Sequence, residues 1–476
     1  MSSLRELLAG WRGLSVRLRA ATVATAVLVV AGAGLVAYLA LKRPGDVSNP
    51  SAQFVKPEPK RKKPRTMNWP MFGYDAARTK SMPARNVKPP FRPIWGWDSG
   101  ALMEFSPIVA HGTVYGQNND GLLFAMDADT GKRRWKKRIG ELSASAPAYS
   151  GGRLYVITLE PGQVMAFRPK DGKLIWRTPL AGRTESSPVV HNGKVIVGCE
   201  CSRVYALSAK NGKVVWETPT AGAVKAAVAL HKNTVYVGDY GGQMNALDAG
   251  DGHVRWTTSD LGLGLGRSGR FYSTAAVAFG RVYAGNVDGR VYSYEASSGN
   301  VAWTRSTGDW VYGGVVVADP KGMPPAVFAG SFDRNVYAFN AKTGAQLWSA
   351  PAGGIVSGAG SVVGDVYYIA TLSKRTYGFN VRTGKRVFKF KTGQYNPVIS
   401  DGRRIDLTGY SGVTALEPVR KKKAKGKRKG KGKGKGAAKT ARGSRRSRGA
   451  PSRRARGKSR SGKSKRKAQR QRARRQ

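Results

Sequence analysis

Hydrophobic residues occur through the middle of the chain in short runs separated by polar, glycine-containing turns. Runs such as Lys194–Val197 and Arg203–Leu207 are rich in β-branched and aromatic residues, which favour strands. The dipeptides Asn211-Gly212 and Thr130-Gly131 supply residues that adopt positive φ and are typical of tight hairpin turns. The pattern therefore predicts an antiparallel meander of short strands.

This pattern repeats with a period close to 40 residues. Each unit ends in an aromatic residue, and the steps between successive ones are 40, 41, 40, 40, 47, 45 and 40 residues. A regular repeat of four strands, which we letter A to D in chain order, is typical of the blades of a β-propeller. The terminal aromatic residues are Trp95, Trp135, Trp176, Trp216, Trp256, Trp303, Trp348 and Phe388.

The two ends of the repeat are predicted to share one blade. Residues Tyr395–Pro418 supply strands of type A to C without a terminal aromatic strand, whereas Phe91–Trp97 has the pattern of an isolated strand D. Joining them closes the ring and removes its exposed strand edges. The predicted fold is therefore all-β: an eight-bladed propeller of four-stranded antiparallel blades over residues 68–418.

An apolar segment near the N-terminus predicts a membrane anchor. Residues 21–41 carry no charge over 21 positions, which is long enough to cross a bilayer as a helix. The apolar part of a cleavable signal peptide is shorter, about 7 to 15 residues, so we expect a single-pass transmembrane helix. Basic residues flank it on both sides and do not set its orientation. Residues 1–20 are then a basic segment, and residues 42–67 a Pro- and Lys-rich linker.

The C-terminal residues 419–476 form a Lys- and Arg-rich tail that is predicted to be disordered. From position 420 onward they hold 29 of the 82 basic residues of the chain and no acid, within a net charge of +54. So few apolar side chains cannot build a core. The tail is expected to bind polyanions: nucleic acid if it is cytoplasmic, or anionic lipid or surface polymer if it is outside. The alternative that the tail only increases solubility and binds no dedicated partner also remains open.

The motif Ala-x-Asp-x-x-Thr-Gly-x-x-x-Trp at Ala125–Trp135 resembles the PQQ-like, or quinoprotein-type, propeller repeat family. Several units keep this frame in part, and the seventh has Gly378 and Phe388 instead of Ala and Trp. The segment Asn68–Pro83 resembles the lead-in of the family. The resemblance implies the fold. It does not specify the function, because the family includes dehydrogenases, outer-membrane β-barrel assembly lipoproteins and sensor ectodomains. Each terminal aromatic residue is expected to pack its blade against the next.

Strand polarity places the D-to-A loops and the B-to-C turns at one end of the propeller, which we call the D–A face. Trp310 occupies none of the blade-packing positions, so it is either an anchor for a partner or a local packing residue over the channel. The candidate contacts of an interaction surface on the D–A face are Lys225, Arg270, Asp309, Trp310 and Tyr312.

An enzyme is the alternative. The resemblance to the quinoprotein dehydrogenases of the family would imply a disulfide between two adjacent cysteines beside the quinone. In this chain Glu200 separates Cys199 from Cys201, so the two cysteines are not adjacent. Free thiols, a local disulfide and a redox role all remain open at this pair. The Ca²⁺ ligands and catalytic Asp of those enzymes cannot be assigned to matching positions, and the large insertions that cover the cofactor are missing. The chain has no Gly-x-Ser-x-Gly, Gly-x-x-x-x-Gly-Lys-Ser/Thr or His-Glu-x-x-His motif.

The sequence therefore favours a protein that resembles the β-barrel assembly lipoproteins of the family more than its dehydrogenases. We expect a non-catalytic, membrane-anchored scaffold for envelope proteins, with neither cofactor nor metal and without a small-molecule substrate. Because propellers of this family are usually exported, the resemblance implies an extracytoplasmic domain. A dehydrogenase that uses PQQ with Ca²⁺, and a nucleic-acid-binding membrane protein acting through the tail, are the alternatives.

Overall fold

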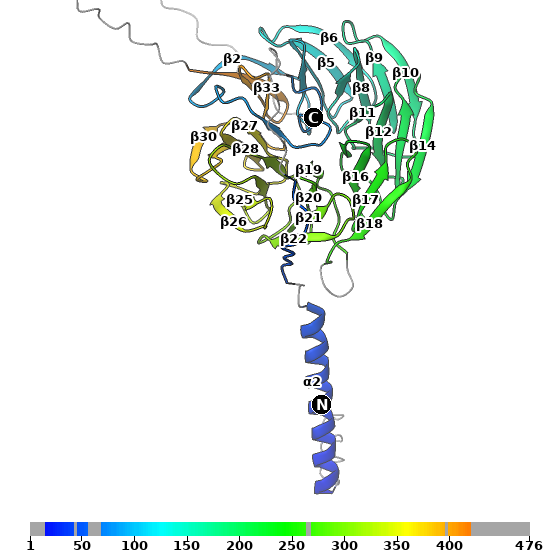
Figure 1. The fold of residues 1–476 in the computed structure, drawn as a ribbon, viewed down its shortest axis with the longest axis vertical. Helices are drawn as coiled ribbons and strands as arrows, with labels where there is room; N and C mark the ends of the chain where they lie inside the picture. The colour runs from blue at the N-terminus through cyan, green and yellow to red at the C-terminus, as the bar shows by residue number, and fades with distance from the viewer. Residues whose placement is uncertain (1–14, 42–44, 56–67, 263–267, 396–397, 420–476) are drawn as a thin grey trace, which may run out of the picture. The chain divides into compact units, whose positions relative to one another are not determined.

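The computed structural model describes residues 15–41, 45–55, 68–262, 268–395 and 398–419 (Figure 1). The helix α2 (Val16–Leu41) begins where Ser15 Oγ accepts a hydrogen bond from the Leu18 amide, at 3.4 Å, as an N-cap residue does. Its apolar part, Val16–Ala37, is long and apolar enough to cross a membrane. The helix thus starts five residues before the predicted span, because two arginines in its first turns are compatible with a helix.

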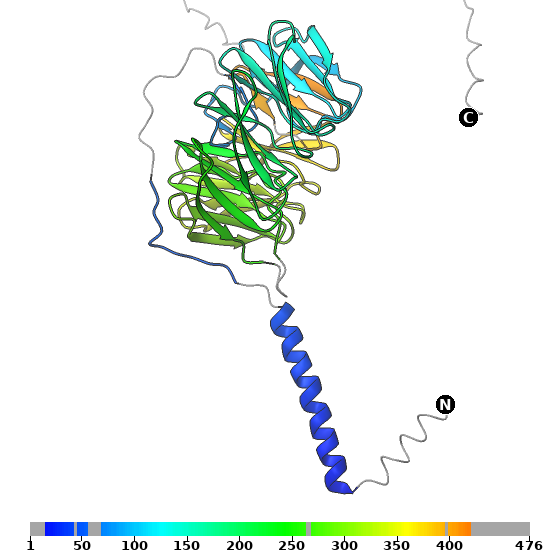
Figure 2. The ribbon, with the colours of Figure 1, turned by 90° about the vertical axis from the view of Figure 1, so that its right-hand side faces the viewer.

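Strands β2 to β33 form eight four-stranded antiparallel sheets arranged as a ring, and the short strand β1 adds to one of them (Figures 1 and 2). This arrangement confirms the predicted fold class. The first three blades, in chain order, are these: blade one has β3 (Ile108–Ala110), β4 (Thr113–Gln117), β5 (Leu122–Asp127) and β6 (Arg133–Arg138); blade two has β7 (Ala148–Ser150), β8 (Arg153–Thr158), β9 (Gln163–Phe167) and β10 (Leu174–Pro179); blade three has β11 (Val189–His191), β12 (Lys194–Cys199), β13 (Arg203–Ser208) and β14 (Val214–Pro219). Blade four has β15 (Ala229–His231), β16 (Thr234–Gly238), β17 (Gln243–Asp248) and β18 (Val254–Ser259), and blade five has β19 (Ala276–Ala278), β20 (Arg281–Gly285), β21 (Arg290–Glu295) and β22 (Val301–Ser306). Blade six has β23 (Val316–Ala318), β24 (Ala326–Gly330), β25 (Asn335–Asn340) and β26 (Gln346–Pro351), and blade seven has β27 (Ser361–Val363), β28 (Val366–Thr371), β29 (Arg375–Asn380) and β30 (Arg386–Phe390).

The eighth blade is built from both ends of the propeller, as predicted. Its strands β31 (Ile399–Ser400), β32 (Ile405–Thr408) and β33 (Gly412–Pro418) are completed by β2 (Phe91–Asp98). Strand β2 pairs antiparallel with β33, from Phe91 opposite Pro418 to Asp98 opposite Gly412. This pairing holds together segments about 300 residues apart in sequence and leaves no blade incomplete.

Seven of the eight described blade junctions use the same contact between an indole and a turn. The Trp on strand D donates its Nε1–H to a backbone carbonyl at the C-to-D turn of the next blade, for example Trp176 to Ala209 O at 3.1 Å. The glycine of that turn lies directly on the indole: a Cβ on Gly212 would lie 2.5 Å from Trp176 Cε3. The other pairs of Trp and acceptor are Trp95 and Ala128, Trp135 and Pro169, Trp216 and Ala249, Trp256 and Ala296, Trp303 and Ala341, and Trp348 and Val381.

The junction between blades seven and eight differs because blade eight has no C-to-D turn. Its fourth strand comes from the other end of the chain, so neither a turn carbonyl nor a turn glycine is available there. Phe388 instead packs edge-on against Phe91 of β2, with ring centroids 5.5 Å apart. A side chain without an N–H donor suits this position, because a buried indole without an acceptor would be destabilising.

Residues 68–83, which we call the central segment, lie against the innermost strands of the ring. Main-chain hydrogen bonds join this segment to strand A of blades one, two, four, five, six and seven, and β1 (Ser81–Met82) pairs in parallel with β27. Arg78, which is fully buried, donates to the carbonyl oxygens of Ser187, Pro188 and Val228, at 2.9 to 3.0 Å, and to that of Phe72. One short segment therefore connects seven of the eight blades that the structure describes.

The fully buried Lys80 extends this network. Its ammonium donates to the carbonyl oxygens of Arg78 and Val315, at 3.0 and 3.1 Å. Burial, and then the charge of Arg78, lowers the pKa of Lys80 to about 7. The carbonyl oxygens accept the hydrogen bonds that water would accept from an exposed ammonium group.

Part of the predicted linker packs on the propeller. Asn49 donates its amide to Ala302 O at 2.8 Å, and Val55 donates to Phe279 O at 2.9 Å, both in the fifth blade or its turns. The buried Arg281 donates to the carbonyl oxygens of Ala52 and Gln53, at 2.8 Å each. Residues 45–55 are thus held on blade five, which the linker's composition did not indicate.

We expect Gly212→Ala to destabilise the propeller by about 2 to 5 kcal/mol, because the new Cβ meets the Trp176 ring and Gly212 has a φ of 77°. Gly193→Ala is the matched control: its φ is 73°, but nothing lies within 4 Å of its Cβ. It should cost about 1 to 2 kcal/mol. Urea denaturation measures both values, and equal losses would contradict the role of the indole contact.

Asp406→Asn should alter the pH dependence of stability. Asp406 is fully buried in β32, and neither of its carboxylate oxygens has a hydrogen-bond partner among the described residues. Burial is the main reason that its pKa is raised to about 7, which Arg404 opposes. The folded state therefore binds more protons than the unfolded state between pH 4 and 7, and this residue makes stability fall as pH rises through that window.

The asparagine cannot ionise, so the variant should be more stable than the wild type at pH 8 and similar to it at pH 4. Thermal unfolding followed by circular dichroism across this range compares the two proteins. The same slope in both would mean that Asp406 does not carry the effect.

Candidate functional site

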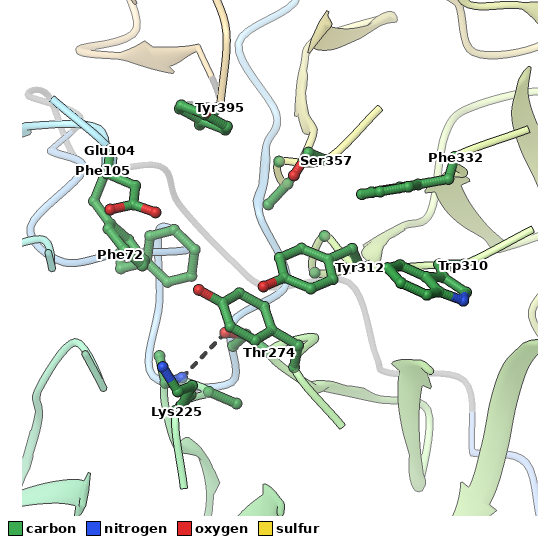
Figure 3. A pocket seen from close by; sticks show the side chains of 17 residues that line it. Phe72, Glu104, Phe105, Lys225, Thr274, Trp310, Tyr312, Phe332, Ser357 and Tyr395 are labelled. Carbon is green, nitrogen blue, oxygen red and sulfur yellow. Dashed lines mark hydrogen bonds between the residues drawn. The ribbon is translucent and has the colours of Figure 1, made fainter. Parts of the chain in front are cut away.

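A pocket of about 390 Å³ lies on the D–A face, where the D-to-A loops of several blades meet (Figure 3). Phe72 of the central segment also lines it. Glu104 and Phe105 lie on one side of the opening, Trp310 and Phe332 on the opposite side. The lining residues are Phe72, Glu104, Phe105, Lys225, Ala226, Ala227, Tyr272, Thr274, Trp310, Tyr312, Gly313, Gly314, Phe332, Ser357, Gly358, Ala359 and Tyr395.

The repeat places one residue from every blade around this opening. The fourth residue before strand A is equivalent in all eight units, and six of these eight residues line the pocket. We call this set the mouth ring. It consists of Glu104, Ala144, Glu185, Lys225, Tyr272, Tyr312, Ser357 and Tyr395.

Glycines let the loops that carry these residues approach one another. A Cβ on Gly358 would lie 1.6 Å from the Tyr395 carbonyl oxygen, and a Cβ on Gly313 would lie 2.1 Å from the Gly358 carbonyl oxygen. Both distances are far below van der Waals contact. Any larger residue would therefore separate the loops and widen the pocket.

Lys225 is the centre of a charged cluster at one side of the mouth ring. Its ammonium lies 3.0 Å from Glu185 Oε1 and 3.2 Å from Glu200 Oε1. Tyr272 donates its hydroxyl to Glu185 Oε2 at 2.8 Å. Burial opposes the charge of Lys225, but the two glutamates outweigh it and raise the pKa of this lysine. Burial, and then Glu185, raises the pKa of Tyr272, so its hydroxyl keeps its proton.

Aromatic side chains form the other side of the pocket. Tyr272 and Tyr312 stack with ring centroids 3.9 Å apart, and Phe332 lies 5.8 Å from Tyr312 and 5.4 Å from Trp310. Trp310 is 47% exposed, which is unusual for a tryptophan packed between other rings. The pocket therefore offers aromatic faces beside a group of carboxylates.

The five candidate contacts on the D–A face occupy different positions. Lys225, Trp310 and Tyr312 line the pocket. Arg270 lies outside the lining, with its guanidinium 5.6 Å from the centre of the Tyr240 ring. Asp309 accepts the Trp310 amide at 2.7 Å and also lies outside the lining.

Phe72, Tyr272 and Tyr395 were not among the predicted contacts. Aligning the units on strand A would have selected the two tyrosines, since they hold the same repeat position as Lys225 and Tyr312. No repeat signal marks Phe72, because the central segment lies outside the repeats.

Cys199 and Cys201 are joined by a disulfide at the turn between β12 and β13. Cys199 is fully buried, and its carbonyl accepts the Val224 amide at 2.9 Å. The bridge encloses Glu200, whose side chain reaches Lys225. Neither cysteine lines the pocket.

The described residues that line this pocket do not offer the ligands expected for a quinone with Ca²⁺. Among the described residues, no group of three or more His, Cys, Asp or Glu side chains is placed to hold a metal ion. Quinone carboxylates would need cations, but Lys225 already serves two glutamates. We therefore derive no step that uses this cofactor.

A family model described as outer membrane protein assembly factor BamB matches residues 86–222, 119–322, 160–390 and 262–425, and so extends over more than half of the chain. The chain belongs to this family of PQQ-like β-propellers. The overlapping matches are those expected when repeats align in several registers.

Known proteins similar to the chain include both assembly factors and enzymes. BamB of Moranella endobia is 34% identical over 136 residues, which cover 24% of this chain and 35% of that protein, so the chain spans about a third of the length of this relative. The crystal structure of BamB from Moraxella catarrhalis has a TM-score of 0.59 at 18% identity, over 69% of this chain and 100% of that one. A europium-containing methanol dehydrogenase has a TM-score of 0.63 at 12% identity, over 74% and 98% of the two chains.

Lys225→Met should destabilise the propeller by about 1 to 3 kcal/mol at pH 7, because it leaves Glu185 and Glu200 together without their cation while the site is only partly buried. Adding Glu185→Gln should restore part of this loss. Urea unfolding at pH 7 measures the effect of the single and the double substitution. An unchanged stability at pH 7 would show that the cluster does not support the loops.

Proposed function

We propose that this protein is a non-catalytic, membrane-anchored scaffold of the bacterial cell envelope that binds another polypeptide at its D–A face. The observation that carries the proposal is the pocket inside the mouth ring. Its exposed Trp310 lies among packed aromatic rings, while the Lys225 ammonium in the same pocket is already paired with Glu185 and Glu200. Exposed aromatic anchors in a depression favour protein recognition, whereas mutually paired acids and bases are poor proton-transfer groups.

The anchor and its attachment support this role. The helix α2 ends at Leu41, and the chain is held on blade five from Asp46, which accepts the Ser306 amide at 3.0 Å. Five residue steps can span at most about 18 Å. With α2 in a bilayer, the edge of blade five would stay close to the membrane, and the propeller would be presented to other envelope proteins.

The family supports a role in assembly. The relatives named above are called outer membrane protein assembly factors, and we extend to this chain the general function of a propeller that brings envelope proteins together. The proposed contacts are Lys225, Arg270, Asp309, Trp310 and Tyr312. The family also supports an extracytoplasmic propeller on a single-pass anchor.

The tail remains a separate proposal, because residues 420–476 lie outside the described part of the chain. Its 29 basic residues favour a polyanion partner: an anionic lipid or surface polymer outside the cell, or nucleic acid if the tail is cytoplasmic. Mapping the membrane topology of Gln476 with a reporter fusion distinguishes these partners.

A photo-crosslinking amino acid tests the docking surface in the full-length chain in its host membranes. Placed at Tyr312, it should capture a specific envelope protein, identified by mass spectrometry. The same residue at Lys232, in an A-to-B turn at the opposite end of the propeller, should not capture this protein. Adding Trp310→Ala should lower capture at Tyr312 by at least about fivefold, as expected for an interface anchor.

Equal capture from Tyr312 and Lys232 would refute docking at the D–A face. The dehydrogenase alternative is tested by adding PQQ and Ca²⁺ to the purified protein. Stoichiometric cofactor binding with reduction of an artificial acceptor in the presence of an alcohol or sugar would overturn the non-catalytic assignment.

A further inference from the structure

The mouth ring has an excess of negative charge, although the whole chain is strongly basic. Glu104 and Glu185 are its two carboxylates and Lys225 is its one ammonium, and Glu200, from the turn between β12 and β13, adds a third carboxylate beside Lys225. The buried cations Arg78 and Lys80 lie 6.0 and 5.8 Å from the centre of the Phe72 ring, where carbonyl oxygens accept their hydrogen bonds. Arg270 lies outside the pocket over Tyr240. Because Lys225 is engaged by two glutamates, Glu104 is the carboxylate that remains for a ligand.

Glu104 is half-buried and has no strong donor in the described part of the chain. The nearest one, the Asn119 amide, is 3.5 Å away. When this amide is turned over, its nitrogen instead makes hydrogen bonds of 3.2 Å to the carbonyl oxygens of Leu102 and Ser143. Burial, and then the charge of Glu185, raises the pKa of Glu104. A cation placed beside this carboxylate would relieve both effects.

The walls around Glu104 are aromatic. Phe105 and Phe72 pack edge-on beside it, at 5.5 Å between ring centroids. Tyr312 and Tyr395 lie on the other sides of the same opening (Figure 3). Aromatic faces attract cations, and a planar guanidinium can also stack on them while it donates two hydrogen bonds to a carboxylate.

We propose that the pocket inside the mouth ring binds an arginine side chain of the partner polypeptide, with its guanidinium on the Glu104 carboxylate and against the aromatic rings. This inference rests on the proposed function and adds the chemical class that the docking site recognises. Charge excludes an acidic side chain from the same place. The flat shape of the guanidinium favours arginine over lysine, because an ammonium cannot stack or bind in two-point fashion.

The test uses the full-length protein in detergent and three short peptides of the form acetyl-Gly-X-Gly-amide. X is arginine, citrulline or lysine; citrulline has the shape of arginine without its charge. Isothermal titration measures the affinities, and the NMR shifts of the side-chain methylene groups report contact with aromatic rings. The arginine peptide should bind at least about tenfold more tightly than the citrulline peptide, the difference expected for a charge-assisted hydrogen bond, with upfield shifts of its δ-methylene protons.

Two variants locate the binding. Glu104→Gln should reduce the arginine affinity to that of the citrulline peptide, and Tyr312→Leu should weaken binding and remove the upfield shift. Glu141→Gln is the matched control, since Glu141 lies in the D-to-A loop between β6 and β7 but outside the pocket. It should change neither quantity. Circular dichroism checks that each variant is folded.

Equal affinity for arginine and citrulline, unchanged binding by Glu104→Gln, or no binding of any peptide would overturn the proposal. Tighter binding of tetramethylammonium than of the arginine peptide would also overturn it, because it would indicate a quaternary ammonium ligand. If these peptides fail while crosslinking from Tyr312 still captures its partner, the scaffold function stands and only the arginine assignment is lost.

Discussion

The contact between an indole on one blade and a turn of the next holds the ring together. It has two parts: a hydrogen bond from the indole N–H to a buried carbonyl, as in Trp176 to Ala209, and a glycine that leaves room for the ring, as in Gly212. Both parts are needed. Without the acceptor, the buried indole N–H would lack a hydrogen bond, and an added Cβ on the glycine would clash with the indole ring. The last junction needs a different solution, the pair Phe388 and Phe91, because strand exchange removes the turn there.

The inside of the ring depends on a second kind of contact. The central segment carries two buried cations, Arg78 and Lys80, whose charges are met by carbonyl oxygens from several blades. A guanidinium without these acceptors could not be buried. The same segment brings Phe72 to the pocket, so the lining of the mouth and the stability of the ring are linked through one stretch of chain.

The fold supports unrelated functions because the residues that pack one blade on the next and the residues of the mouth ring occupy different positions of the repeat. The frame residues, Trp and Gly, repeat in every unit except the last junction. The mouth ring occupies a fixed repeat position, but its residues range from Glu185 and Lys225 to Tyr272 and Ser357. The similarity to solved structures of both assembly factors and dehydrogenases therefore shows the fold alone.

The sequence alone determined the blade number, the shared last blade and the packing positions of Trp95 to Trp348, because turns, strand alternation and repeat spacing are short-range properties. It also indicated which end of the propeller holds Lys225, Trp310 and Tyr312. Only the tertiary structure decided that Lys225 bridges Glu185 and Glu200, that no described cation forms an ion pair with Glu104, and that residues 45–55 pack on blade five. Charge pairing and desolvation depend on distances between different blades, and no local pattern in the chain encodes those distances.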